Sequence, residues 1–374
     1  MPLLALKRWT PPSYDPPEGE FHKTLIVGYP SGDKRLTYIQ MEALTGLTAK
    51  DEWEFDYFGI TNYPFIKSNY PHHEGIWGWE QEADQVIMIV RNLRRTIVEY
   101  HDILWDIGYA ETYDVAMEHA QNLYRERPPL NDFLHWRDEY VIDEIQWYGW
   151  FIDYWMEGGL MRDIFSHRIT TPRHWNMLMI PNGYSREDVD YSLIVGDDVI
   201  VTPSYDPHCL NDVSDGCRPK EIISAERLLV NGTGPIETRK IASVLQGKQG
   251  IGDYLIEEDA WDCIWEELII NKKGSKTFLD REGLTERHYN FSEEMLEIMI
   301  EEQNRLIAKY TGHEWISVGI AQNLVDIITE HRDLLAVELI EVQSGERRLR
   351  PHDFLGPKTR ARKKFKMNEG SDYW

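Results

Sequence analysis

The chain has 374 residues and a formal net charge of −24, from 40 basic and 64 acidic side chains. This balance argues against a nucleic-acid-binding protein, because a phosphate backbone requires a basic face. Apolar residues make up 42% of the chain and aromatic residues 12%, which excludes a disordered or collagen-like chain. No stretch reaches the roughly 18 consecutive apolar residues of a membrane span. We therefore expect a soluble globular protein, in the cytoplasm or in a Golgi or other organelle lumen.

The two ends of the chain differ in composition from its middle. Residues 1–20 carry five prolines and predict a Pro-rich N-terminal arm. Residues 346–374 predict a basic C-terminal tail, since positions 347–366 hold nine basic and one acidic side chain, a net charge of +8. We interpret this tail as neutralising part of the acidic body. Residues 21–345 are then predicted to form one α/β domain.

Three short apolar segments predict buried parallel strands, at residues 24–29, 64–68 and 86–90. Apolar residues at helical spacing follow the first and third of these segments, at residues 36–47 and 93–104. Strands that alternate with helices in this way predict a central parallel sheet with helices on both faces. The fold class expected from the sequence is therefore α/β.

The second half of the chain is predicted to be mainly helical. Residues 133–156 are rich in aromatic side chains, and the spacing of Trp136, Tyr140, Trp147, Phe151 and Tyr154 predicts one helix with a packed aromatic face. Residues 175–218 are rich in Pro, Gly and Asp and predict a long insertion. Further helices are expected at residues 235–245, 260–270, 292–310 and 316–334, with Ser292 as an N-cap.

The loop at residues 28–35 is a candidate anion site. It lies between a predicted strand and a predicted helix, so backbone N–H groups at the helix N-terminus can bind a phosphate. Lys34 and Arg35 add positive charge. An ordinary strand-to-helix turn is the alternative, since the spacing of a Walker loop is absent.

Four segments, in this order, resemble the motifs of sulfotransferases. They are residues 28–32 (Gly-Tyr-Pro-Ser-Gly), 66–71 (Ile-Lys-Ser-Asn-Tyr-Pro), 90–100 (Val-Arg-Asn-Leu-Arg-Arg-Thr-Ile-Val-Glu-Tyr) and 271–274 (Asn-Lys-Lys-Gly). The family motifs are a Y-P-K-S-G-T-T loop, a K-T-H-x-P strand end, an R-N-P-x-D-x-x-x-S segment and a late R-K-G. The resemblance is closest to divergent algal sulfotransferase-domain proteins and runs from about residue 24 to about residue 310.

The resemblance implies a P-loop-like sulfotransferase fold and transfer of a sulfuryl group to a hydroxyl acceptor, either a small molecule or a glycan. The donor of the family is 3′-phosphoadenosine-5′-phosphosulfate. Lys67 and Lys34 take the catalytic positions, where their charge would neutralise the transferring group. The positions implied for donor binding are Ser31, Gly32, Lys34, Arg35, Arg91, Lys272, Lys273 and Gly274.

Three departures from the family pattern open an alternative. The lysine between Pro30 and Ser31 is absent, Asn69 stands where the family has its catalytic histidine, and Glu99 stands where a serine meets the 3′-phosphate. An amide cannot act as a general base, and a carboxylate repels a phosphate. The alternative is a catalytically degenerate member, a pseudoenzyme that serves as a scaffold or assembly subunit and contacts a protein partner or further copies of itself.

Other titratable residues are candidates of lower rank. Glu42 and His72 are possible replacements for the missing base, although we interpret His72 and His73 as surface histidines. Residues 206–217 hold several metal-ligand types, but their irregular spacing matches no zinc or calcium pattern, so no metal site is predicted. Cys209 and Cys217 are close enough in the chain to close one loop by a disulfide.

Overall fold

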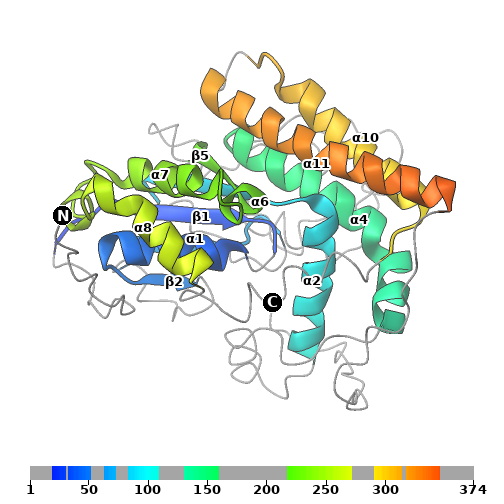
Figure 1. Cartoon of the computed structure of the whole chain (residues 1–374), viewed down its shortest axis with the longest axis horizontal. Helices are drawn as coiled ribbons and strands as arrows, with labels where there is room; N and C mark the ends of the chain where they lie inside the picture. Colours follow the sequence, from blue (N-terminus) through cyan, green and yellow to red (C-terminus); the bar gives the residue numbers. More distant parts are fainter. Residues whose placement is uncertain are drawn as a thin grey trace, which may run out of the picture.

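The computed structural model (Figure 1) describes residues 19–30, 33–51, 63–72, 83–108, 130–159, 217–271, 290–313 and 317–345. Nearly all of the predicted N-terminal arm and insertion, and the whole basic tail, lie outside these residues. The strands are β1 (Thr24–Gly28), β2 (Ala49–Asp51), β3 (Phe65–Ser68), β4 (Gln85–Val90) and β5 (Pro219–Ser224). The α-helices are α1 (Asp33–Thr45), α2 (Leu93–Gly108), α4 (Leu130–Met156), α6 (Ala225–Leu228), α7 (Gly234–Leu245), α8 (Trp261–Trp265), α10 (Glu293–Tyr310) and α11 (Val318–Ser344). Two short 3-10 helices, η7 (Gly252–Tyr254) and η8 (Glu258–Ala260), precede α8, and a π-helical turn, η9 (Glu266–Ile270), follows it.

The five strands form one parallel sheet in the order β2-β3-β1-β4-β5. The predicted strands at residues 24–29, 64–68 and 86–90 are confirmed as β1, β3 and β4, and so is the α/β class. Strands β2 and β5 were not predicted. Strand β2 is only Ala-Lys-Asp at the sheet edge, and β5 begins with a proline and two charged residues before its apolar Ile222 and Ile223. Neither strand has the long apolar run that marks a buried strand.

Side chains that alternate along the strands build two cores, one on each face of the sheet. On one face, Leu25, Val27 and Met88 pack with residues of α4, α10 and α11. On the other face, Ile26 and Ile87 pack with residues of α1, α7 and α8. Helices therefore cover both faces, and Figure 1 shows α1, α7 and α8 beside the strands at the left, with α4, α10 and α11 in the other part of the molecule. Because both faces are covered, every residue of β1 and β4 is buried.

The predicted aromatic helix is confirmed as α4, with Phe151 and Trp147 buried. Trp136 is only partly buried, and Tyr140 is 43% exposed although the helical spacing placed it on the packed face. In its second half α4 lies between the sheet and α10, so residues on nearly every side of this stretch are buried. The first half has fewer neighbours, and Tyr140 packs there on Trp136 with ring centroids 6.3 Å apart.

An ion-pair cluster joins α4 to α10. The carboxylate of Asp153, which is buried, lies 2.8 Å from Arg305 Nη1 and 2.9 Å from Lys309 Nζ. The hydroxyl of Tyr310 donates to Asp153 Oδ1 at 2.6 Å. Burial raises the pKa of Asp153, but the opposite effect of Arg305 and Lys309 is larger. The pKa of Asp153 is therefore below its usual value. The charge of Asp153 therefore stabilises the contact between these helices.

Helices α10 and α11 form an antiparallel pair over α4 (Figure 1). The predicted N-cap is confirmed, because the Ser292 side chain accepts from Met295 N. Helix α11 runs ten residues beyond the predicted end at 334, since Leu335, Leu339 and Val342 continue to pack on the core. Gly345 closes it with a positive φ of 70°, which favours glycine.

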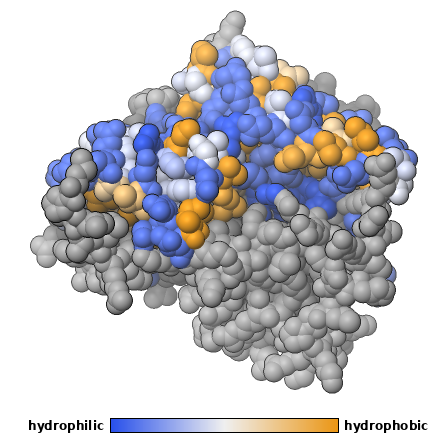
Figure 2. All heavy atoms as spheres, viewed as in Figure 1, coloured by the Kyte–Doolittle hydropathy of each residue, from blue (hydrophilic) through white to orange (hydrophobic). Residues whose placement is uncertain are grey.

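The surface of the described residues is mixed in polarity. Figure 2 shows hydrophobic side chains among hydrophilic ones, and the exposed apolar residues include Leu334, Val337 and Ile340 of α11. No helix among the described residues has the length and apolar character needed to cross a membrane. Cys217 is disulfide-bonded and Cys263 is a free thiol, while Cys209 lies outside the described residues.

Candidate functional site

The carboxyl ends of β1 and β4 meet at one edge of the sheet. Their register pairs Gly28 with Ile89, so the segments that follow both strands start side by side. Strands β2 and β3 lie on one side of β1, and β4 and β5 on the other, which makes this edge the point where the strand order reverses. Ligands of open α/β sheets bind at such a point. Helices α1 and α2 also begin here, and their N-termini favour anions.

Arg91, the first residue after β4, is buried and forms an ion pair with Glu99 of α2. The two side chains are only 3% and 5% exposed, so water screens this pair little. The backbone carbonyl of Arg91 accepts a hydrogen bond of 2.7 Å from the Tyr148 hydroxyl of α4. The residue that the resemblance assigns to the 3′-phosphate is therefore at the predicted edge, with its charge already balanced from within the chain.

The two arginines that follow also have carboxylate partners. Arg94 Nε lies 2.5 Å from Glu338 Oε2 of α11, and Arg95 Nη1 lies 3.5 Å from Glu226 Oε1 of α6. All three arginines of the segment at residues 90–100 are thus paired with internal carboxylates. The segment carries no excess of positive charge for a phosphate.

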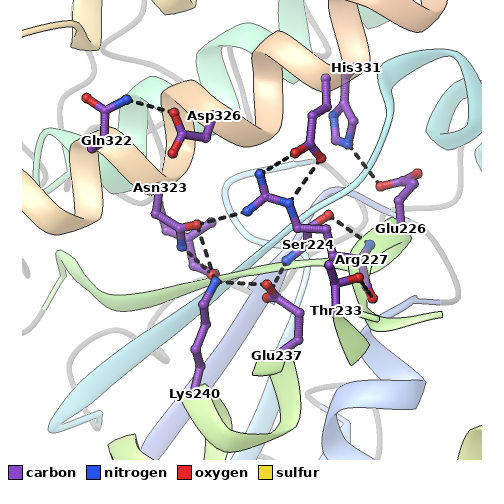
Figure 3. Close-up of polar contacts among 12 residues, drawn as sticks. Ser224, Glu226, Arg227, Thr233, Glu237, Lys240, Gln322, Asn323, Asp326 and His331 are labelled. Atoms are coloured by element: carbon purple, nitrogen blue, oxygen red, sulfur yellow. Dashed lines mark hydrogen bonds and ion pairs between the residues drawn. The ribbon is translucent and has the colours of Figure 1, made fainter. Parts of the chain in front are cut away.

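Glu226 belongs to a polar network at the ends of β4 and β5, and Figure 3 shows its side chain facing His331. Its Oε2 lies 3.0 Å from His331 Nε2, and its Oε1 accepts from the backbone N of Asn92 at 3.0 Å. Burial raises the pKa of Glu226, but His331, and then Arg91 and Arg95, lower it to about 2. Glu226 is therefore a second carboxylate that is ionised near Arg91.

Around this network, polar contacts hold α6, α7 and α11 against β5 (Figure 3). The backbone N of Ser224 donates to Glu237 Oε2 at 3.1 Å, and Lys240 Nζ lies 2.8 Å from Glu237 Oε1. Asn323 of α11 donates to the carbonyl of Ile222 at 2.8 Å. These contacts fix the position of Glu226 at the sheet edge.

Three buried side chains meet at the ends of β1 and β3. The hydroxyl of Tyr29 donates to Glu144 Oε2, and His72 Nε2 lies 3.6 Å from the same oxygen. The imidazole also packs against the rings of Tyr29, Tyr100 and Trp147, with centroids 4.8, 4.9 and 5.7 Å away. Burial, and next Glu144, raise the pKa of Tyr29 well above its usual value, so its hydroxyl keeps the proton.

The interpretation of His72 as a surface histidine is wrong. Its side chain is wholly buried, because the turn after β3 brings it under the aromatic face of α4. The backbone N of His72 donates to Asn69 O at 2.9 Å and closes this turn. The sequence contains a possible partner for His72 in Glu144, in the middle of the aromatic stretch, but the 72 residues between them along the chain hid the pair.

Lys67 approaches the edge from the other face of the sheet. It pairs in register with Ile26, so it shares the face of Ile26 rather than that of Tyr29. Its Nζ lies 5.3 Å from the ring centroid of Tyr38 in α1. Glu42, the other candidate base, has a structural contact, because its Oε1 accepts from Ala49 N at 2.8 Å.

The remaining predicted site residues are only partly covered by the structure. Lys34 and Arg35 belong to the first turn of α1, and the structure describes their backbone but not their side chains. The other five positions lie outside the described residues: Ser31, Gly32, Lys272, Lys273 and Gly274. Within the described ranges, no group of three or more metal-ligating side chains is present.

Comparison with known proteins gives no relative for this chain. No family model matches it, and neither a curated protein nor a solved structure matches it. Its function must therefore be argued from the residues at the sheet edge.

Proposed function

We propose that this chain is a sulfotransferase-type enzyme with a P-loop-like sulfotransferase fold, which transfers a sulfuryl group from a sulfated adenine nucleotide to a hydroxyl acceptor. One observation carries the proposal. The segments after β1 and β4, which resemble the family's two nucleotide motifs, start side by side where the strand order reverses. This is where open α/β sheets bind nucleotides.

The N-termini of α1 and α2 suit the 5′-phosphosulfate end of such a donor. Backbone N–H groups and the helix dipoles favour its negative charge. Lys34 and Arg35 lie in the first turn of α1 and add charge there, and Lys67 approaches from the same face of the sheet. Ser31, Gly32, Lys272, Lys273 and Gly274 are the further positions that we assign to the donor.

His72 is the residue that we assign as the general base in place of Asn69. In the transfer, the acceptor oxygen forms a bond to sulfur while the bond from sulfur to the leaving phosphate oxygen breaks. The hydroxyl proton passes to the imidazole of His72. Glu144 then stabilises the imidazolium, and Tyr29 holds Glu144 in place through its hydrogen bond.

The described residues do not fit the 3′-phosphate of the family's donor. Arg91, Arg94 and Arg95 each have an internal carboxylate partner, and Glu99 directly pairs with Arg91. This observation favours a second candidate function, a catalytically degenerate scaffold that binds no nucleotide.

Calorimetric titration separates the two functions. The purified chain is titrated with adenosine 5′-phosphosulfate, adenosine 5′-phosphate and 3′-phosphoadenosine-5′-phosphate. Binding of any of them, with competition among them, is the result expected for the enzyme. If none of the three binds at millimolar concentration, the proposed transfer is wrong and the scaffold is favoured.

A further inference from the structure

We infer that the nucleotide site at this edge selects a ligand with a free 3′-hydroxyl and discriminates against a 3′-phosphate. The inference rests on the proposed function, since it names the substrate class of the same site. It reverses the ligand preference that the resemblance implies. The residues that carry it are Arg91, Glu99 and Glu226.

The charges around Arg91 are already balanced. Glu99 forms a buried ion pair with its guanidinium, and Glu226 also lies close enough to interact with it electrostatically. Neither neighbouring arginine is available to compensate, because Arg95 is paired with Glu226 and Arg94 with Glu338. Arg91 and its carboxylate neighbours have no excess positive charge that could offset the two negative charges of a bound phosphate dianion. Little water is present at this buried place to screen the repulsion.

A ribose hydroxyl is not repelled by these carboxylates. It is neutral, and it can donate a hydrogen bond to a carboxylate, which only accepts when ionised. Dinucleotide-binding sheets use the same chemistry, where an acidic residue binds a ribose hydroxyl and an arginine accommodates a phosphate at that position. Glu99 lies in the second turn of α2, and its carboxylate pairs with Arg91 at the end of β4. The charges at this edge therefore favour a ribose with free hydroxyls over one that carries a phosphate.

Two ligands that differ only in the 3′-phosphate test the inference. The native chain is titrated with adenosine 5′-phosphate and with 3′-phosphoadenosine-5′-phosphate at fixed salt. We expect adenosine 5′-phosphate to bind at least tenfold more tightly, which corresponds to about 1.4 kcal/mol. In Glu99→Ser, which restores the family's residue and frees Arg91, we expect the preference to reverse. Glu330→Gln, on the exposed side of α11, removes one charge elsewhere and should leave the native preference unchanged.

The possible results have separate meanings. If native protein binds 3′-phosphoadenosine-5′-phosphate as tightly as adenosine 5′-phosphate, or more tightly, the inference is overturned while the proposed function stands. If neither ligand binds, the proposed function itself fails. Should Glu99→Ser unfold because Arg91 loses its partner, Glu99→Gln keeps the hydrogen-bonding shape without the charge. This variant should reduce the native preference at least threefold, and an unchanged ratio would overturn the inference.

Discussion

Glu226 allows a stability prediction with a defined pH dependence. Burial raises the pKa of Glu226 in the folded chain, but His331, and then Arg91 and Arg95, lower it from its usual 4.5 to about 2. A group with a depressed pKa stabilises the folded state above its unfolded pKa, and this stability is lost as the pH falls toward the folded pKa. The charge of Glu226 therefore contributes at neutral pH and is lost between about pH 4.5 and pH 2.

The perturbation is Glu226→Gln, which keeps the shape of the side chain and removes its charge. The shift in pKa corresponds to a loss of about 3 kcal/mol of unfolding free energy at pH 7. At pH 3.5 the same substitution should cost only about 2 kcal/mol, because part of the native effect is already lost.

Urea unfolding followed by tryptophan fluorescence measures both values. Glu330→Gln is the matched control, since Glu330 also forms an ion pair on this side of the molecule but its side chain is 56% exposed. The control should lose less than about 1 kcal/mol at either pH. A loss below 1 kcal/mol for Glu226→Gln at pH 7, or a loss that grows as the pH falls, would refute the electrostatic reasoning.

Three further variants test other parts of the structure. His72→Gln should lower the rate of sulfuryl transfer about 10²- to 10⁴-fold without changing nucleotide affinity, and an unchanged rate would remove its assignment as the base. Asp153→Asn should cost about 3 kcal/mol of unfolding free energy, measured with urea, because Arg305 and Lys309 lose a buried partner; a cost under 1 kcal/mol would contradict that account. Ser292→Ala should cost about 1 kcal/mol through loss of the N-cap of α10, and Ser292→Thr, which retains an acceptor, should recover most of it.

The sequence was sufficient for the parts of the fold that depend on local pattern. Strands β1 and β4 are continuous apolar runs, and α10 has a recognisable cap, so each could be assigned from neighbours in the chain. Strand β5 could not, because Pro219, Lys220 and Glu221 occupy half of it. Its place beside β4 depends on tertiary contacts rather than on propensity.

The sequence predicted that the segments after β1 and β4 meet at one edge of the sheet, and Arg91 lies there. It did not predict the charges that surround Arg91. The partners Glu226 and Glu338 come from segments more than a hundred residues away, so their pairing with Arg95 and Arg94 could not be read from spacing. His72 was misplaced for the same reason, since the pattern around it contains no sign of the helix that covers it.

The position of β5 in the sheet has a consequence for how the chain acquires its structure. Strand β4 forms its outer pairing with β5, from which it is separated by roughly 130 residues, so this pairing closes a long loop late in synthesis. Until Pro219 and the residues after it have left the ribosome, the apolar β4 presents an open edge that can pair with another chain. A nascent or truncated chain that stops before β5 is therefore expected to aggregate through β4, and chaperone binding should concentrate there.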